Sequence, residues 1–281
     1  MAVSLSSAYV DEAAVEWYDI AFDWRRDKEA DFAETCLREF GRRTKGAVVD
    51  LACGGGHFLR EMQDRGWRVA GVDLSSQMID RARKRLSAPC TLELAHMSDF
   101  TLGEAFDMAT CWLDSLPYLR SNDEIIGHLQ CVARVLTGGG LYLVDMGFSC
   151  WADPMWQGRH GQWRPDGYEG WCARRGDTEV YHDGWYGPPC DGLARLCTEY
   201  LHFRVTDLGT RIVTERTHTA WKRALHPQEF AALVSASNMF EVVEWFAGSF
   251  ALNQTLQSTD GRGRGIVLLR KRGSEGVARH A

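Results

Sequence analysis

The sequence has no apolar run approaching the roughly 18 residues needed to span a bilayer, and it has no excess of basic residues. Its formal net charge of −6 argues against a nucleic-acid or anionic-membrane partner, because such partners usually require a basic face. The N-terminal residues lack a basic start and soon become acidic, so no secretory signal is predicted. We therefore expect a cytoplasmic protein without a nucleic-acid or membrane partner.

Close cysteine pairs are also absent. None of the nine cysteines forms a CxxC pair, whereas zinc sites usually show such pairs and disulfide frameworks are typical of short secreted chains. Most of the cysteines lie beside apolar residues, where a free thiol behaves as a small hydrophobic side chain. We expect reduced, structural thiols.

Between residues 47 and 147, apolar strand-like runs alternate with helical segments, and one or two helices are expected before them. This alternation predicts an α/β fold with a doubly wound, mostly parallel sheet. It stops near residue 147: residues 148–192 are rich in Gly, Pro and Trp, and we predict no regular element there. Residues 193–225 indicate two long strands joined around "DLGT", and a helix and two strands follow.

The predicted organisation has four parts. Residues 1–147 form N-terminal helices and the core, and residues 148–222 form an inserted, mainly antiparallel cap rich in tryptophan. Residues 223–272 return to the core, and residues 273–281 form a polar tail.

The stretch "VVDLACGGGHFL" at residues 48–59 reads as a strand, a tight glycine turn and the start of a helix. Such a turn lets backbone N–H groups approach a ligand closely. Asp73 ends the next predicted strand, where a carboxylate can accept hydrogen bonds from ribose hydroxyls. The dinucleotide pattern GxGxxG fails, because it would require glycine at Leu59 or His57, and no lysine follows the glycines as in a P-loop.

"VVDLACGGG" resembles the D/E-x-G-x-G-x-G signature of class I S-adenosylmethionine-dependent methyltransferases, with Ala52 replacing the first glycine. "GVDLSSQMI", "MSDF", "FDMATCWLDSLPYL" and "VLTGGGLYLVD" resemble the family's later landmarks, in order and at similar spacing, with Thr137 replacing proline in the last. "EWYDIAFDW" resembles the segment of small-molecule methyltransferases that covers the cofactor.

The resemblance implies S-adenosylmethionine as cofactor. It implies that Asp73 holds the ribose, that Met78 packs near the adenine, that Asp99 binds the adenine amino group and that Phe100 flanks the ring. The full set of expected cofactor contacts is Tyr18, Asp50, Ala52, Gly54, Gly56, Asp73, Leu74, Met78, Ser98, Asp99, Phe100 and Cys111.

Aromatic side chains are expected to line the acceptor pocket, because their faces attract cations and suit both a sulfonium and an amine-like or indole-like acceptor. The expected substrate contacts are Trp24, Trp112, Tyr118, Trp151, Trp156, Trp163 and Glu215. Tyr18, His160 and Asp114 are the expected catalytic residues, with His182 and His218 as further candidate bases. No metal is expected, because no Asp-Asn pair follows the carboxylates near the fourth strand. His57 is expected to be structural, His128 partly solvated, and the "RARKR" run at 81–85 a solvated helix face.

The sequence therefore predicts methyl transfer to a nitrogen or electron-rich carbon of a small, aromatic or heterocyclic natural product. Two alternatives remain open: a non-catalytic protein that binds S-adenosylmethionine, and a nicotinamide-dependent oxidoreductase. A homo-oligomer is also possible.

Overall fold

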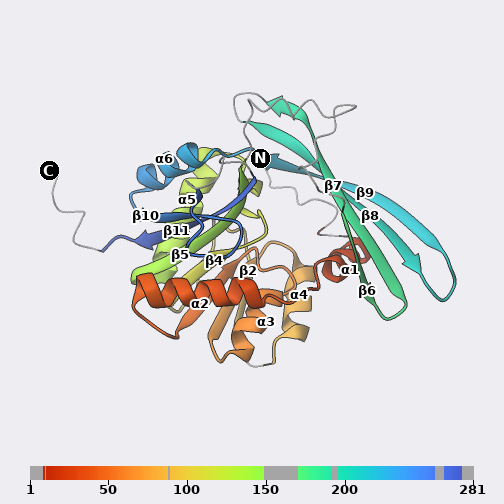
Figure 1. Ribbon diagram of the computed structural model, residues 1–281, viewed down its shortest axis with the longest axis horizontal. Helices are drawn as coiled ribbons and strands as arrows, with labels where there is room; N and C mark the ends of the chain where they lie inside the picture. The colour runs from red at the N-terminus through yellow and green to blue at the C-terminus, as the bar shows by residue number, and fades with distance from the viewer. Residues whose placement is uncertain are drawn as a thin grey trace.

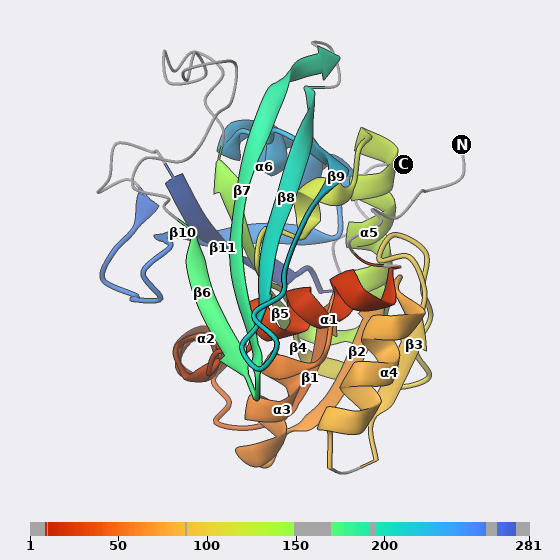
Figure 2. The same ribbon diagram turned by 90° about the vertical axis from the view of Figure 1, so that its right-hand side faces the viewer.

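The computed structural model describes residues 9, 11–87, 89–148, 170–191, 195–256 and 263–273. These residues form an α/β core and a long antiparallel sheet that leans against it (Figure 1). Helix α1 (Glu12–Ala21) lies between the two parts. The view in Figure 2 looks onto the antiparallel sheet with α1 beneath its strands. The predicted α/β fold class is confirmed.

The core sheet has seven strands in the order β10-β11-β5-β4-β1-β2-β3. All neighbours pair in parallel except those of β11, which runs antiparallel to both β5 and β10. The bounds are β1 Ala47–Leu51, β2 Arg68–Asp73, β3 Thr91–Leu94, β4 Phe106–Cys111, β5 Leu136–Phe148, β10 Phe240–Ala247 and β11 Gly263–Lys271. The strand order reverses between β1 and β4, and ligands of open α/β sheets bind at the carboxyl ends of strands at such a point.

Helices cover both faces of the core sheet, which explains why all five residues of β1 are buried. Helices α2 (Asp27–Gly41), α3 (His57–Asp64) and α4 (Ser76–Arg85) pack on one face. Helices α5 (Asn122–Val135) and α6 (Pro227–Ser237) pack on the other. A capping box between Ser121 and Glu124 starts α5, and Pro227 stands in the first turn of α6, as its sequence predicts.

The second sheet has four antiparallel strands in chain order: β6 (Trp171–Arg175), β7 (Thr178–Asp191), β8 (Leu196–Asp207) and β9 (Val213–Arg223). We call it the cap sheet. The predicted hairpin of β8 and β9 is confirmed, and burial alternates along β8 because one face packs on the protein. Strands β6 and β7 are not expected from the sequence, since glycines and register shifts interrupt the pattern of β7.

Helix α1 joins the two parts. Ile20 and Ala21 pack against Val180, Leu201 and Phe203 on the inner face of the cap sheet. The residue before this apolar pair is Asp19, which is buried and faces the core. The helix therefore holds the cap sheet at a set position over the carboxyl ends of the core strands.

Candidate functional site

The glycine turn after β1 has three residues with positive φ: Ala52 at 56°, Gly54 at 52° and Gly56 at 79°. Ala52 therefore adopts a conformation that glycine takes more readily, at the position where the family pattern has glycine. Gly56 is required by packing, because a Cβ there would lie 3.2 Å from the Cα of Ala82 on α4. Gly56 thus allows α3 and α4 to approach, whereas Gly54 faces a cavity.

Asp73, at the end of β2, organises this turn. Its Oδ2 accepts the N–H of Gly54 at 2.8 Å, and its Oδ1 accepts the N–H of Ser75 at 2.8 Å. Burial raises the pKa of Asp73, although these N–H groups oppose the shift. Each carboxylate oxygen has a second lone pair, so the group can also accept hydroxyl donors from a ligand.

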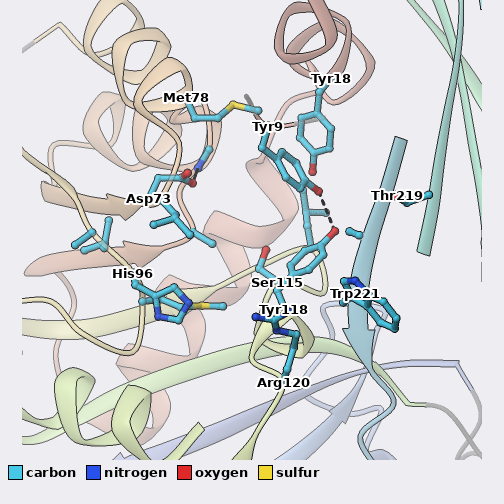
Figure 3. A pocket seen from close by; sticks show the side chains of 18 residues that line it. Tyr9, Tyr18, Asp73, Met78, His96, Ser115, Tyr118, Arg120, Thr219 and Trp221 are labelled. Carbon is cyan, nitrogen blue, oxygen red and sulfur yellow. Dashed lines mark hydrogen bonds between the residues drawn. The ribbon is translucent and has the colours of Figure 1, made fainter. Parts of the chain in front are cut away.

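A cavity of about 450 Å³ opens beside Asp73. Figure 3 shows Asp73, Met78 and His96 on one side of it, with Tyr118, Thr219 and Trp221 on the other. The predicted site residues that line it are Tyr18, Ala52, Gly54, Asp73, Leu74, Met78 and Tyr118. We call it the cofactor cavity.

Six predicted cofactor contacts do not line this cavity: Gly56, which packs on α4, Asp50, which borders a smaller cavity, and Ser98, Asp99, Phe100 and Cys111. Asp99 is exposed, Phe100 is buried in the hydrophobic core, and Cys111 is fully buried beside Tyr142. The hydroxyl of Ser98 contacts the ring of His96 rather than the cavity. The reason is that β3 ends at Leu94, so the next residues of the chain already form the wall: Ala95, His96 and Met97. Asp99 and Phe100, which we expect to contact the adenine, therefore do not line this cavity.

A smaller cavity of about 70 Å³ continues past Gly54 and Gly55. Arg26 lines it, buried and paired with Glu29 at 2.9 Å, although the sequence analysis did not single it out. Trp112 also lines it, and its indole Nε1 is buried without a hydrogen-bond partner among the described residues. Trp112 is therefore placed at the glycine turn rather than in the acceptor pocket where we expected it.

Asp50 borders the same small cavity and accepts the hydroxyl of Thr110 at 2.7 Å. Burial raises the pKa of Asp50 to about 7, against the effect of that hydrogen bond. A buried N–H donor without a partner, a buried guanidinium and a carboxyl group suit the carboxylate and amino group of a methionine moiety. The two cavities together thus fit S-adenosylmethionine, and Asp73 keeps the position at which we expect the ribose.

Asp19 fixes α1 over the glycine turn. Its carboxylate contacts His57 at 3.0 Å, Arg85 at 3.0 Å and Arg175 at 3.0 Å, and Arg81 at 3.6 Å. Burial would raise the pKa of Asp19, but hydrogen bonds from His57 and Arg85 lower it well below its ordinary value.

These contacts correct the interpretation of "RARKR" as a solvated helix face. Arg81 and Arg85 turn toward the protein, and Arg85 also donates to the carbonyl oxygen of Gly55. His57 has the structural position that we predicted for it, between α3 and Asp19.

A third cavity, of about 280 Å³, lies under the cap sheet, and we call it the cap chamber. Its walls include the predicted residues Trp24, Asp114 and Tyr118, together with His182 and Glu199. Four residues belong to the walls of both this chamber and the cofactor cavity: Tyr9, Tyr18, Leu113 and Tyr118.

A buried charge cluster joins the core to the cap sheet at this chamber. Lys222 on β9 contacts Asp114 after β4 at 2.7 Å and Glu199 on β8 at 3.0 Å. Burial alone would lower the pKa of Lys222, but the two carboxylates raise it well above its ordinary value. Tyr118 donates to Glu199 at 2.6 Å, and Tyr9 in turn donates to Tyr118 at 2.8 Å (Figure 3). Lys222 and Glu199 were not expected, because nothing in their local sequence brings them together.

The remaining predicted residues lie outside the chamber. Glu215 is exposed on β9 near Arg204, so the expectation that it binds substrate is wrong for the cavities formed by the described residues. His218 is buried on the opposite face of β9, as alternation requires. His160 and the tryptophans Trp151, Trp156 and Trp163 lie outside the described residues.

His128 is fully buried, not partly solvated as expected. Its Nδ1 donates to the carbonyl oxygen of Met97 at 2.7 Å, and its Nε2 accepts the hydroxyl of Tyr142 at 2.5 Å. Burial lowers the pKa of His128 to about 4. The residue supports the wall of the cofactor cavity from behind, since Met97 lines that cavity.

Two further properties of the described residues concern metal binding and membrane insertion. No group of three or more His, Cys, Asp and Glu side chains is arranged to hold a metal ion. No helix in this part of the chain is long and apolar enough to cross a membrane.

Residues 48–140 match the family described as "Methyltransferase domain". The chain is 33% identical over 105 residues to a putative methyltransferase of Bacillus subtilis, YqeM, covering 36% of this chain and 42% of that protein. It is 35% identical over 103 residues to the dTDP-3-amino-3,4,6-trideoxy-alpha-D-glucopyranose N,N-dimethyltransferase of Streptomyces venezuelae, covering 35% of this chain and 41% of the relative. Both matches span less than half of the relatives' own lengths.

A solved S-adenosylmethionine-dependent methyltransferase from Clostridium acetobutylicum has the same fold, with a TM-score of 0.69 at 18% identity over 94% of this chain and 99% of the other. Residues 48–140 thus match a methyltransferase domain, and the chain shares the fold of an S-adenosylmethionine-dependent methyltransferase.

Proposed function

We propose that the protein transfers a methyl group from S-adenosylmethionine to a nitrogen or electron-rich carbon of a small aromatic or heterocyclic acceptor in the cap chamber. The observation that carries this proposal is the shared wall of the cofactor cavity and the cap chamber. Tyr9, Tyr18 and Tyr118 stand at this wall, so a methyl group directed past them from the cofactor side enters the chamber. When bound, the cofactor would supply an electrophilic methyl group, which the acceptor would attack in line while S-adenosylhomocysteine leaves with the electron pair of the broken bond between sulfur and carbon.

The aromatic lining supports a flat acceptor. Phe22, Trp24, Trp171, Trp185 and Tyr186 all contribute to the chamber walls. Phe22 and Trp24 each meet Trp171 nearly edge-on, with ring centroids 5.1 and 5.7 Å apart. Rings in this arrangement leave apolar faces for stacking and attract cationic groups.

The protonation states of the chamber residues favour an acceptor that enters the chamber uncharged or that loses its proton only after methyl transfer. Lys222 stays protonated between its two carboxylates and cannot act as a base at neutral pH. Burial and the charge of Glu199 raise the pKa of Tyr18 to about 12, so its hydroxyl also keeps its proton. Tyr18 can then donate a hydrogen bond where the methyl group is transferred, and this agrees with the catalytic role that we predict for it.

His182 is the base that the chamber offers. Its Nδ1 donates to the carbonyl oxygen of His202 at 2.9 Å, which leaves Nε2 as the nitrogen with a free lone pair. Burial lowers the pKa of His182 to about 4, so the ring is neutral at pH 7. An amine needs little help from such a weak base, whereas a carbon acceptor must lose a proton after transfer.

Asp114 retains a supporting part. Its Oδ1 accepts the N–H of Gly147 at 2.8 Å and its Oδ2 binds Lys222. Both oxygens are therefore engaged in fixing the chamber wall. We propose that Asp114 holds the charged side chain of Lys222 in place and does not itself take a proton.

A labelled methyl-transfer assay tests the function. Full-length protein with methyl-labelled S-adenosylmethionine would be offered aromatic amines, indoles, phenols and aliphatic amino sugars. Label in an aromatic or heterocyclic amine or indole supports the proposal. Transfer to amino sugars alone would overturn the aromatic preference and align the chain with its relative named for a sugar substrate.

Binding measurements complete the test. S-adenosylhomocysteine, but not NAD, is expected to bind with a defined dissociation constant, which separates the proposal from the oxidoreductase alternative. Binding of S-adenosylhomocysteine without transfer to any acceptor would favour the non-catalytic alternative. Trp171→Ala is expected to reduce transfer, whereas Trp67→Phe, which lies away from the chamber among the residues of α2 and α3, is not.

A further inference from the structure

Arg120 lines the cofactor cavity although nothing in the methyl donor requires a cation there. Its guanidinium makes no hydrogen bond or ion pair with any part of the chain that the structure describes; only its backbone N–H is engaged, by Glu124 at 2.6 Å. The other described arginines around the site are paired: Arg26 with Glu29, Arg85 with Asp19 and Arg264 with Asp145. A cavity-facing guanidinium without a protein partner points to an anionic ligand.

The position of Arg120 is fixed by its backbone. Glu124 accepts the N–H of Arg120 and also that of Ser121, as part of the capping box that starts α5. The side chain therefore projects from a rigid helix start rather than from a free loop. The Oε2 of Glu124 accepts both of these backbone donors.

His96 lies near Arg120 on the wall of the same cavity. Burial lowers the pKa of His96; the charges of Glu124 and Asp99 oppose this shift, and the charge of Arg120 adds to it. The Nδ1 of His96 accepts the backbone N–H of Ser98 at 3.3 Å, so its Nε2 carries the proton and is a donor. In Figure 3, Arg120 lies between His96 on one side and Trp221 on the other.

Trp221 supplies a flat surface at the same end of the cavity. It stands on the edge strand β9, and 48% of its surface is exposed, which is unusual for so large an apolar side chain. The hydroxyl of Thr219, two residues earlier on β9, also lines the cavity. A guanidinium and an exposed indole that line the same cavity suit an anion attached to a planar group.

S-adenosylmethionine does not supply this anion. Its only carboxylate belongs to the methionine end, for which Arg26 and Trp112 provide the donors in the small cavity. Its adenosine end carries no charge and lies toward Asp73 and Leu74. The anion must therefore come from the second substrate.

We propose that Arg120, with Trp221, forms a subsite for an anionic group of the methyl acceptor, either a carboxylate or a phosphate, at the outer end of the cofactor cavity. The inference rests on the proposed function, since it assumes that the methylated atom of the acceptor lies beside Tyr118, which lines both cavities, while the anionic group of the acceptor extends into the cofactor cavity. It adds a charge requirement to the acceptor class: a neutral analogue of the same shape binds less well.

The test uses full-length protein saturated with S-adenosylhomocysteine and four probes followed by calorimetry or ligand-observed NMR. Phenyl phosphate and benzoate distinguish the two anions, benzyl alcohol is the neutral match, and inorganic phosphate lacks the ring. At least one of the aromatic anions is expected to bind, more tightly than benzyl alcohol and less tightly as salt is raised. Arg120→Met is expected to weaken that anion roughly tenfold or more, as loss of a charged hydrogen bond requires.

Arg38→Met is the matched control, because Arg38 is an exposed arginine of α2 that pairs only with the neighbouring Glu39. It is expected to leave every dissociation constant unchanged. Trp221→Ala is expected to bring phenyl phosphate down to the affinity of inorganic phosphate. The affinity of Arg120→Met for S-adenosylhomocysteine should match the wild type, which shows that the variant is folded.

Equal binding of the anions to wild type and Arg120→Met would overturn the subsite, as would failure of both aromatic anions to bind while S-adenosylhomocysteine binds normally. In either case the proposed methyl transfer would stand. Failure of S-adenosylhomocysteine itself to bind would instead remove the proposed function.

Discussion

The cofactor side and the cap side of this protein are built in different ways. On the cofactor side, the ligand-facing groups lie at the ends of consecutive strands of one sheet: Gly54 after β1, Asp73 at the end of β2 and Met97 after β3. On the cap side, the charge cluster joins Asp114 of the core to Glu199 and Lys222 of the cap sheet. The first arrangement depends mainly on backbone turns, and the second on side chains that only the tertiary fold brings together.

This difference predicts where the protein tolerates change. Backbone donors at a turn survive most side-chain substitutions, whereas a buried ion cluster depends on each member. Removing one member leaves its partners charged in a medium that solvates them poorly.

Lys222→Met is expected to have the largest effect. It removes the buried cation and leaves Asp114 and Glu199 without compensation, which costs about 3–5 kcal/mol of the free energy of unfolding. Urea unfolding followed by tryptophan fluorescence measures this change. The double variant Lys222→Met/Glu199→Gln should recover part of the loss, because one of the two stranded charges is then gone.

A loss below about 1 kcal/mol for Lys222→Met would show that solvent reaches the cluster, since exposed ion pairs contribute at most that much. The cap side would then not depend on a buried ion cluster, and its contrast with the cofactor side would be lost. The exposed pair Arg38–Glu39, with both side chains about half exposed, provides the reference value through Arg38→Met.

On the cofactor side, Asp73→Ala is expected to weaken binding of S-adenosylhomocysteine by roughly 1.5–3 kcal/mol, the range for hydrogen bonds that involve a charged group. The carboxylate also holds the N–H groups of Gly54 and Ser75, so part of the loss comes from a less ordered turn. Calorimetric titration measures the dissociation constant, and circular dichroism checks that the fold is retained. An unchanged constant would remove Asp73 from the ribose role.

The pH dependence of stability also tests this comparison, because each side of the molecule has a buried histidine with a lowered pKa. Burial holds the pKa of His128 in the core and of His182 in the cap at about 4, below the ordinary value near 6.5 of the unfolded chain. Between these values the unfolded chain binds more protons, so stability is complete above about pH 6.5 and is lost as the pH falls toward 4. Each histidine accounts for roughly 1 kcal/mol of that loss at pH 5.5.

Unfolding free energies measured from pH 7.5 to 4.5 test this expectation. His128→Gln and His182→Gln should each flatten the profile, whatever their effect on stability at pH 7.5. Profiles parallel to that of the wild type would show that these rings are solvated and titrate normally. A change in only one variant would assign the acid sensitivity to that side of the molecule.

The same difference explains what the sequence could predict. The parallel core, the glycine turn and the position of Asp73 follow from local patterns, because strand, turn and helix signals lie within about 25 residues of each other. Asp99 and Phe100 were expected to line the cavity, whereas Ala95, His96 and Met97 do so, because the landmark does not say where β3 ends.

The cap chamber could be predicted only in part. Aromatic content indicated a pocket lined with rings, and Trp24 and Tyr118 do lie in its walls. Lys222 and Glu199 carry no local signal of their partnership, because their contact depends on the register between β8 and β9. The positions of Arg26 and Trp112 beside the small cavity depend in the same way on how α2 and the loops after the strands pack.

The smallest effect is expected for Glu215→Gln, which tests the register directly. Glu215 lies on the exposed part of β9, 3.8 Å from Arg204, and both side chains are more than half exposed. Its loss should change the free energy of unfolding by less than about 0.5 kcal/mol and leave acceptor methylation unchanged. Glu199→Gln makes the same chemical change on the buried face of the neighbouring strand, where the carboxylate binds Lys222 and Tyr118. It should lower both stability and methylation. Equal effects of the two variants would mean that β9 is paired one residue out of register, because such a shift exchanges its two faces.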